Sequence, residues 1–215
     1  MDSTPLILAL GNPGPQYERT RHNFGFMVAD AILAQASARK SMALKSLQTS
    51  GDFELFALTF GGASCLLAKP MTYMNLSGKA AARILGKYAL PATSMVVLHD
   101  ELDLPLGRMK LKRGGGSNGH RGIESIVEHT GTEDFLRLRL GIGRPQFSSD
   151  VVTYVLEEFD AKDLVALDAV RQAAVKGLAL FFRRGLNEAV QMLNAFRLPE
   201  PSAPLEKMDT PGTLG

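Results

Sequence analysis

The sequence predicts an α/β fold, a single domain in which a mixed, twisted sheet is flanked by helices on both faces. Short apolar runs alternate along the 215 residues with stretches of helical periodicity, and no internal repeat of useful length is present. A hydrophobic share of 45% and a charged share of 21% suit a globular chain with one sizeable core. We place the domain at residues 1–198, followed at 199–215 by a Pro/Gly-rich tail that is expected to be flexible.

The amino-terminal half predicts a strand, a helix, a hairpin and a second helix. Residues 5–11 are an apolar run that stops at the turn GNPG, which is typical of a buried central strand. Apolar positions at helical spacing over about 23–39 predict a helix on one face of the sheet. The segments FELFALTF and ASCLLAKP, separated by two glycines, predict a hairpin. The helix formers in KAAARILGKYAL then predict a helix, with Asn75 and Ser77 as candidate caps.

The carboxyl-terminal half continues the alternation. SMVVLHD predicts a buried strand that carries His99 and Asp100 at its carboxyl end, where open α/β sheets usually place their chemistry. RMKLKR and LRLRLGIGR alternate, so each is predicted as a strand, and GGGSNGHRGIESIVEH runs from a glycine-rich loop into a helix. Helices are also expected around 150–157, 160–182 and 185–196.

Positive charge is concentrated in one part of the chain. The net charge is only +2, which argues against a uniform polycation, but residues 105–145 hold eight Lys or Arg against four Asp or Glu. Lys110 and Lys112 share one strand face, as do Arg137 and Arg139. With a helix start between them, these side chains suit a phosphate backbone, and the scarcity of aromatics disfavours base stacking. Solvated strand faces are the alternative.

Several classes of protein are disfavoured by what the chain contains. A single cysteine, Cys65, excludes an internal disulfide framework and a multi-thiolate zinc site, and it favours a cytoplasmic location. The opening apolar run LILAL is too short for a membrane span, so no membrane partner is expected. The GxGxxG match through Gly114, Gly116 and Gly119 lacks the acidic residue of a dinucleotide site, and no GK[ST] follows it. No GxSxG elbow is present, so covalent catalysis is disfavoured.

Candidate site residues lie at turns and at strand ends. The four histidines do not form an HExxH motif, although His22, His99 and Asp100 together could still build a metal site. Asn12, Tyr17 and Asn75 have structural alternatives, in turn formation, core packing and helix capping respectively. Taken singly, none of them decides a function.

Taken together, four segments resemble bacterial-type peptidyl-tRNA hydrolase. They are LGNPGPQYERTRHNFGF, KPMTYMNLSGKA, VVLHDELDLPLGRMKLKRGGGSNGHRGI and FLRLRLGIGRP, in the family's order and spacing. The resemblance runs from about Leu6 to Phe196. It implies an esterase that cleaves the bond between a peptide and the 3′ ribose oxygen of tRNA, and so recycles tRNA, with no cofactor and no metal.

The resemblance also implies roles for individual residues. His22 is the expected general base, because an unperturbed imidazole titrates near pH 6.5, and Asp100 is expected to hold and polarise it. Asn12 is the third expected catalytic residue, and Asn75 is expected to bind the peptide with it. The other expected substrate contacts are Tyr17, Met74, His120 and Arg121, and the tRNA acceptor stem is assigned to Lys110, Lys112 and Arg139.

One position departs from the family pattern. The family usually reads GHNG where this chain reads GHRG, so Arg121 replaces an asparagine thought to contact substrate and water. Arginine cannot accept a hydrogen bond. We hypothesise that Arg121 instead binds a phosphate of the tRNA end, while Asn12 and Asp100 position the water.

Two rival functions stay open at this point. The first is a non-catalytic RNA-binding member of the same fold, against which the presence of both His22 and Asp100 argues. The second is a metal-dependent hydrolase built on His22, His99 and Asp100. A monomer is the expected oligomeric state, since no exposed apolar stripe can be identified from the sequence.

Overall fold

A computed structural model describes residues 4–147 and 150–198 of the chain. Its centre is a seven-stranded sheet in the order β2-β3-β4-β1-β5-β7-β6. β1 pairs in parallel with both β4 and β5, and β5 pairs in parallel with β7, whereas the remaining pairs are antiparallel. The strands are β1 (Leu6–Ala9), β2 (Lys45–Gln48), β3 (Phe53–Phe60), β4 (Ala63–Pro70), β5 (Met95–Glu101), β6 (Met109–Arg113) and β7 (Leu136–Gly141).

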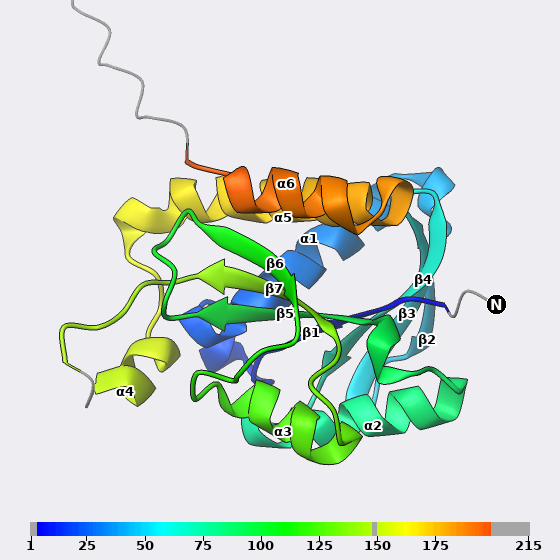
Figure 1. The fold of residues 1–215 in the computed structure, drawn as a ribbon, viewed down its shortest axis with the longest axis horizontal. Helices are drawn as coiled ribbons and strands as arrows, with labels where there is room; N and C mark the ends of the chain where they lie inside the picture. The colour runs from blue at the N-terminus through cyan, green and yellow to red at the C-terminus, as the bar shows by residue number, and fades with distance from the viewer. Residues whose placement is uncertain (1–3, 148–149, 199–215) are drawn as a thin grey trace, which may run out of the picture.

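Helices cover both faces of this sheet (Figure 1). One hydrophobic cluster joins the sheet to α1, α5 and α6, and a second joins it to α2 and α3 on the other face. The short helix α4 lies beyond the carboxyl ends of β5 and β7. The helices are α1 (Phe24–Ala38), α2 (Ser77–Tyr88), α3 (Arg121–Thr130), α4 (Val151–Leu156), α5 (Leu164–Arg184) and α6 (Leu186–Ala195).

This architecture confirms the predicted α/β fold with helices on both faces. β1 is central and fully buried because both of its faces pack against helices, which explains its uninterrupted apolar sequence. The predicted hairpin is β3 and β4, in antiparallel register from Phe53 opposite Pro70 to Phe60 opposite Ala63. The predicted tail at 199–215 lies outside the described residues.

Two details differ from the sequence prediction. Asn75 and Ser77 do not cap α2, because Leu76 occupies the N-cap position and makes no side-chain cap hydrogen bond. Strand β2 was not predicted, because its residues are mostly exposed and polar and it forms the edge of the sheet, where burial imposes no apolar pattern.

The alternation in β7 does not produce an exposed basic face. Arg137 is only 3% exposed, donates from one terminal nitrogen to the Gly116 carbonyl at 3.0 Å and stacks over the ring of Phe135. Burial lowers the pKa of this guanidinium from its usual value. Arg137 therefore stabilises the glycine-rich loop through its hydrogen bond to Gly116 and does not form part of an exposed basic surface.

None of the helices in residues 4–147 and 150–198 combines the length and the apolarity that crossing a bilayer requires.

Candidate active site

A cleft of about 300 Å³ opens at the carboxyl edge of the sheet. Its floor is formed at the ends of β1 and β5, and its sides by the turn before α2, the start of α3 and the helix α4. This position follows from the fold, because parallel strands leave a crevice outside their carboxyl ends. Asn12 and Asp100 lie at this floor, and His22 and Met74 also line the cleft.

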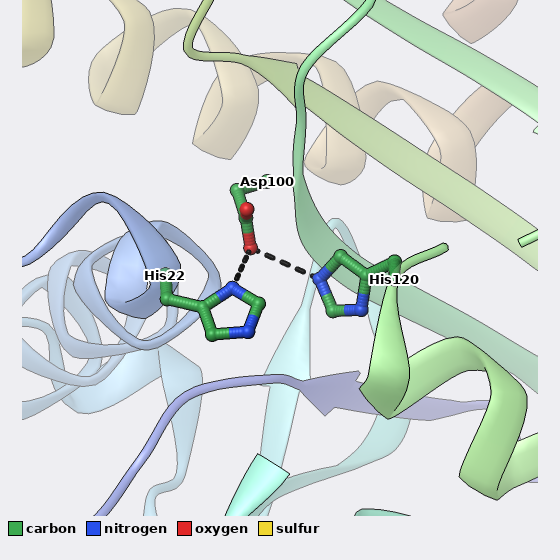
Figure 2. Close-up of side chains that lie close together, drawn as sticks. All are labelled: His22, Asp100 and His120. Carbon is green, nitrogen blue, oxygen red and sulfur yellow. Dashed lines mark hydrogen bonds and ion pairs between the residues drawn. The ribbon is translucent and has the colours of Figure 1, made fainter. Parts of the chain in front are cut away.

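His22 enters the cleft from the single helical turn Arg21–Asn23 that precedes α1. The close approach of α1 to the sheet depends on Gly25, where a Cβ atom would lie 2.5 Å from the Leu98 carbonyl oxygen. Any larger residue would push the helix away from the strand ends. His22 is thereby brought to Asp100, 78 residues further along the chain, with its Nδ1 atom 2.9 Å from Asp100 Oδ1 (Figure 2).

Asp100 is a buried carboxylate with two imidazole neighbours. Its side chain is 2% exposed, and its Oδ1 atom also lies 3.0 Å from His120 Nε2. Burial alone would raise the pKa of Asp100, but the charges and hydrogen bonds of His22 and His120 lower it well below its usual value. Asp100 is therefore ionised at neutral pH.

The pKa of His22 is raised above its ordinary value of 6.5. Burial acts to lower it, because the charged imidazolium loses solvation, but the charge of Asp100 and its hydrogen bond together outweigh burial. The positive charge of Arg121 opposes this increase. His22 is accordingly a stronger base than a free histidine, while 12% of its side chain stays open to solvent.

Asn12 is held rigidly beside this pair. Its backbone N–H donates to Asn23 Oδ1 at 2.8 Å, and its carbonyl accepts from Asn23 Nδ2 at 2.9 Å. Its own Oδ1 accepts from the backbone N–H of Met74 at 2.8 Å. Within the described residues the Nδ2 group of Asn12 has no partner, so it can donate to a molecule in the cleft.

Of the other predicted substrate contacts, all but one line the cleft. Met74, Asn75 and Arg121 line the cleft, with Met74 buried and the other two exposed. Tyr17 is half-buried and is not among the residues that line the cleft. His120 lines it, but both of its ring nitrogens already have partners within the protein.

The predicted tRNA-binding residues also differ among themselves. Lys110 is exposed and Lys112 half-buried, and neither forms an ion pair with any of the described residues. Arg139 donates from Nε to the buried carboxylate of Glu101 at 2.6 Å, and its side chain is 16% exposed. The charge of Arg139 is therefore largely balanced inside the protein, whereas the charges of the two lysines are not balanced by an ion pair with any described residue.

Sequence reasoning did not indicate which residues form the apolar wall of the cleft or which side chain anchors that wall. Four residues of α4 line the cleft, namely Val151, Val152, Val155 and Leu156. Arg21, next to His22 in the chain, holds α4 in place by donating to the Tyr154 carbonyl at 3.2 Å and stacking on the Tyr154 ring at 4.2 Å. The apolar run VVTYVL signals a helix, but only the fold shows which of its residues face the cleft.

The residues here could also be considered as metal ligands. Within the described residues, one potential ligand atom from each of His22, Asp100 and His120 lies within 4.8 Å of the others. His22 Nδ1 and His120 Nε2 both hydrogen-bond to Asp100 Oδ1, so a cation bound between these atoms would have to replace both bonds. Among the described residues His99 does not join this group, and its Nδ1 atom instead hydrogen-bonds with the backbone carbonyl of Asp100 at 2.6 Å.

Comparisons with known proteins agree on one family. The family model described as peptidyl-tRNA hydrolase matches residues 6–201. The chain belongs to the peptidyl-tRNA hydrolase family. A peptidyl-tRNA hydrolase of Maridesulfovibrio salexigens is 56% identical over 202 residues, which cover 93% of this chain and 98% of the relative. One from Aquifex aeolicus is 46% identical over 178 residues, covering 80% and 87%.

Solved structures of this family share the fold. The crystal structure of peptidyl-tRNA hydrolase from Acinetobacter baumannii matches with a TM-score of 0.82 at 31% sequence identity, covering 92% of this chain and 97% of that chain. Membership in the peptidyl-tRNA hydrolase family confirms the resemblance seen in the sequence. It also assigns the chain to the carboxylic ester hydrolases.

Proposed function

We propose that this member of the peptidyl-tRNA hydrolase family hydrolyses the ester between a peptide and the 3′ ribose oxygen of tRNA, with His22 as the general base. One observation carries the assignment of the base. The hydrogen bond between His22 and the buried, ionised Asp100 lies at the floor of a cleft that is open to solvent. A base polarised in this way can activate water for attack on an ester.

The reaction balances with these groups alone. Neutral His22 takes a proton from a water molecule through Nε2, because Nδ1 faces Asp100. The water oxygen then bonds to the carbonyl carbon and places negative charge on the carbonyl oxygen. As the tetrahedral intermediate collapses, the bond to the ribose oxygen breaks and the imidazolium returns its proton to that oxygen. Asp100 stabilises the imidazolium while it exists.

Asn12 and Asn75 are proposed to bind the peptide part of the substrate. The unpartnered Nδ2 group of Asn12 can donate to the carbonyl oxygen as its negative charge develops, which stabilises the transition state. The exposed amide of Asn75 can both donate to and accept from a peptide group. An aminoacyl-tRNA with a free ammonium would leave such groups unpaired, so an N-acylated substrate is preferred.

The basic edge of the sheet is proposed to bind the acceptor-stem phosphates. Lys110 and Lys112 on β6 carry charges without an ion-pair partner among the described residues, and Lys112 Nζ lies beside the glycine-rich loop that leads to the cleft. A phosphate backbone attracts such charges without regard to base sequence. Arg139 is assigned a smaller part because Glu101 already binds it.

Replacing Lys112 by alanine should weaken tRNA binding more than it slows chemistry. We expect KM to rise several-fold and kcat to change less, since a phosphate contact far from the ester acts equally on the substrate and the transition state. Steady-state kinetics at fixed salt measure both constants. Lys45→Ala on β2, at the opposite edge of the sheet, is the matched control. A larger loss in kcat than in KM would contradict this division of roles.

Arg121 is proposed to bind a phosphate of the tRNA end. It is exposed, lines the cleft and is the first residue of α3, where backbone N–H groups and the helix dipole add to its charge. For Arg121→Asn, the slope of log affinity against log salt should become shallower by about one contact. Titrations of tRNA over a range of salt concentrations measure this slope. An unchanged slope would show that Arg121 does not contact phosphate.

The function is tested with the purified protein on N-acetyl-aminoacyl-tRNA and on the free-amine form, with and without excess chelator. We expect turnover of the acetylated substrate, much slower turnover of the free amine, and no effect of the chelator. Loss of activity in chelator would favour a metal-dependent hydrolase. Zero turnover with intact tRNA binding would instead favour the non-catalytic RNA-binding alternative.

We further propose that the protein acts in the cytoplasm as a monomer. The buried, free thiol of Cys65, whose pKa burial raises to about 12, suits a reducing compartment. One chain also supplies His22, Asp100 and Asn12, so no second copy is needed to complete the site.

A further inference from the structure

His120 has both ring nitrogens occupied by groups of the protein. Nε2 lies 3.0 Å from Asp100 Oδ1, the oxygen that His22 also contacts (Figure 2). Nδ1 accepts from the backbone N–H groups of Gly122 and Ile123 at 3.2 and 3.4 Å, which makes His120 the N-cap of α3. Its side chain is 8% exposed. His120 therefore has no nitrogen left for a substrate, although it lines the cleft.

These contacts determine where the protons lie. A nitrogen that accepts from backbone N–H groups carries no hydrogen, so the proton of neutral His120 is on Nε2 and is donated to Asp100. An ionised carboxylate is acceptor-only, so His22 Nδ1 also donates to it. Asp100 Oδ1 thus receives two N–H groups, and His22 Nε2 is left as a bare acceptor.

We propose that His120 is a positioning residue, whose Nε2–H group aims Asp100 at His22 and limits how much of the carboxylate charge His22 experiences. This proposal rests on the proposed function of His22. The N–H group of His120 orients the carboxylate and offsets part of its negative charge, so Asp100 stabilises the imidazolium of His22 less than it would without that hydrogen bond. His120 therefore acts on the reaction through Asp100 and not on the substrate.

The titratable and charged groups around His22 let this influence of His120 be measured as a change in the pKa of His22. Asp100 faces it from β5, Arg121 from the start of α3 and His120 from the residue before α3. The residues of α4 that line the cleft are Val151, Val152, Val155 and Leu156, which carry no charge. Removing the Nε2–H group of His120 should let Asp100 stabilise the imidazolium of His22 more strongly. The pH at which His22 loses its proton should then rise.

Two substitutions separate the two functions of the His120 ring. In His120→Asn the amide lies where Nδ1 lies, so its oxygen can still cap α3, as asparagine commonly does, while the donor to Asp100 is lost. In His120→Gln the longer side chain places an amide N–H near the position of Nε2, so the donor to Asp100 is kept and the cap is lost. Each variant is thus the control for the other.

The test compares pH profiles of kcat/KM for N-acetyl-aminoacyl-tRNA. For His120→Asn we expect the acid limb at higher pH and kcat/KM about tenfold lower at neutral pH, mainly through kcat, with KM within about twofold. For His120→Gln we expect the acid limb at its wild-type position. A purely structural role through the cap predicts the reverse, with His120→Gln impaired and His120→Asn unaffected. That reverse pattern, or wild-type profiles in both variants, would overturn the proposal.

An NMR titration of the His22 ring gives a readout that does not depend on turnover. The pKa of His22 should be higher in His120→Asn than in the wild type and unchanged in His120→Gln. If the wild type does not hydrolyse the substrate, the proposed function fails, but this titration still decides whether His120 controls the charge that His22 experiences. Equal His22 pKa values in all three proteins would refute the proposal.

Discussion

Replacing His22 by alanine should abolish measurable hydrolysis of N-acetyl-aminoacyl-tRNA while leaving tRNA affinity within a few fold. General base catalysis commonly contributes about 10²–10⁴ in rate. Of the described histidines that line the cleft, His22 is the one whose ring keeps a nitrogen free to accept from water. Binding depends on the basic edge of the sheet and on contacts to the peptide, which the substitution leaves in place. Single-turnover kinetics and a filter-binding titration on the same preparation measure the two quantities separately.

His129→Ala is the matched control for this experiment. His129 lies on α3 outside the cleft, and its ring binds the Ser125 carbonyl at 2.9 Å. It should keep wild-type activity, because His129 does not line the cleft and its hydrogen bond stays within α3. Substantial hydrolysis by His22→Ala, or a loss of tRNA affinity as large as the loss of rate, would show that His22 is not the base.

Replacing Asp100 by asparagine should lower kcat by about 10²–10⁴ and move the acid limb of the pH profile to lower pH. In the wild type the charge of Asp100 overcomes the burial of His22, so the limb should lie above pH 6.5. Activity should rise with pH through the raised pKa, because only neutral imidazole can accept a proton. Without the charge, burial and the nearby Arg121 dominate, and both lower the pKa of His22.

The reduced rate in Asp100→Asn has a second cause. The asparagine amide can donate to Nδ1 of His22, which favours the tautomer that carries its proton on Nε2 and cannot act as the base. Kinetics between about pH 5 and 9 measure both effects. Asp103→Asn is the control, because Asp103 is a more exposed carboxylate whose partners are Arg144 and Asn118. An acid limb that stays in place in Asp100→Asn would contradict the proposed origin of the His22 basicity.

Much of the fold could be predicted because elements packed against the core carry a recognisable pattern of apolar residues. The uninterrupted apolar run of β1 required a central strand, and the helical spacing over 23–39 required a helix against the sheet. The edge strand β2 has no such apolar pattern, because most of its side chains are exposed to solvent. The caps of α2 were predicted wrongly because Asn75 and Ser77 have cap-forming side chains, but the backbone places Leu76 at the cap.

For the candidate site, the sequence determined which groups are available and at which strand ends and turns they lie. It supplied His22, Asp100, Asn12 and the basic residues of β6, because side-chain chemistry and element type are local properties. Only the tertiary structure decided how these groups share their hydrogen bonds. His120 binds Asp100 and a helix start at once, Glu101 binds Arg139, and α4 closes one side of the cleft. Each of these contacts joins residues from separate elements, so it arises only when those elements pack together.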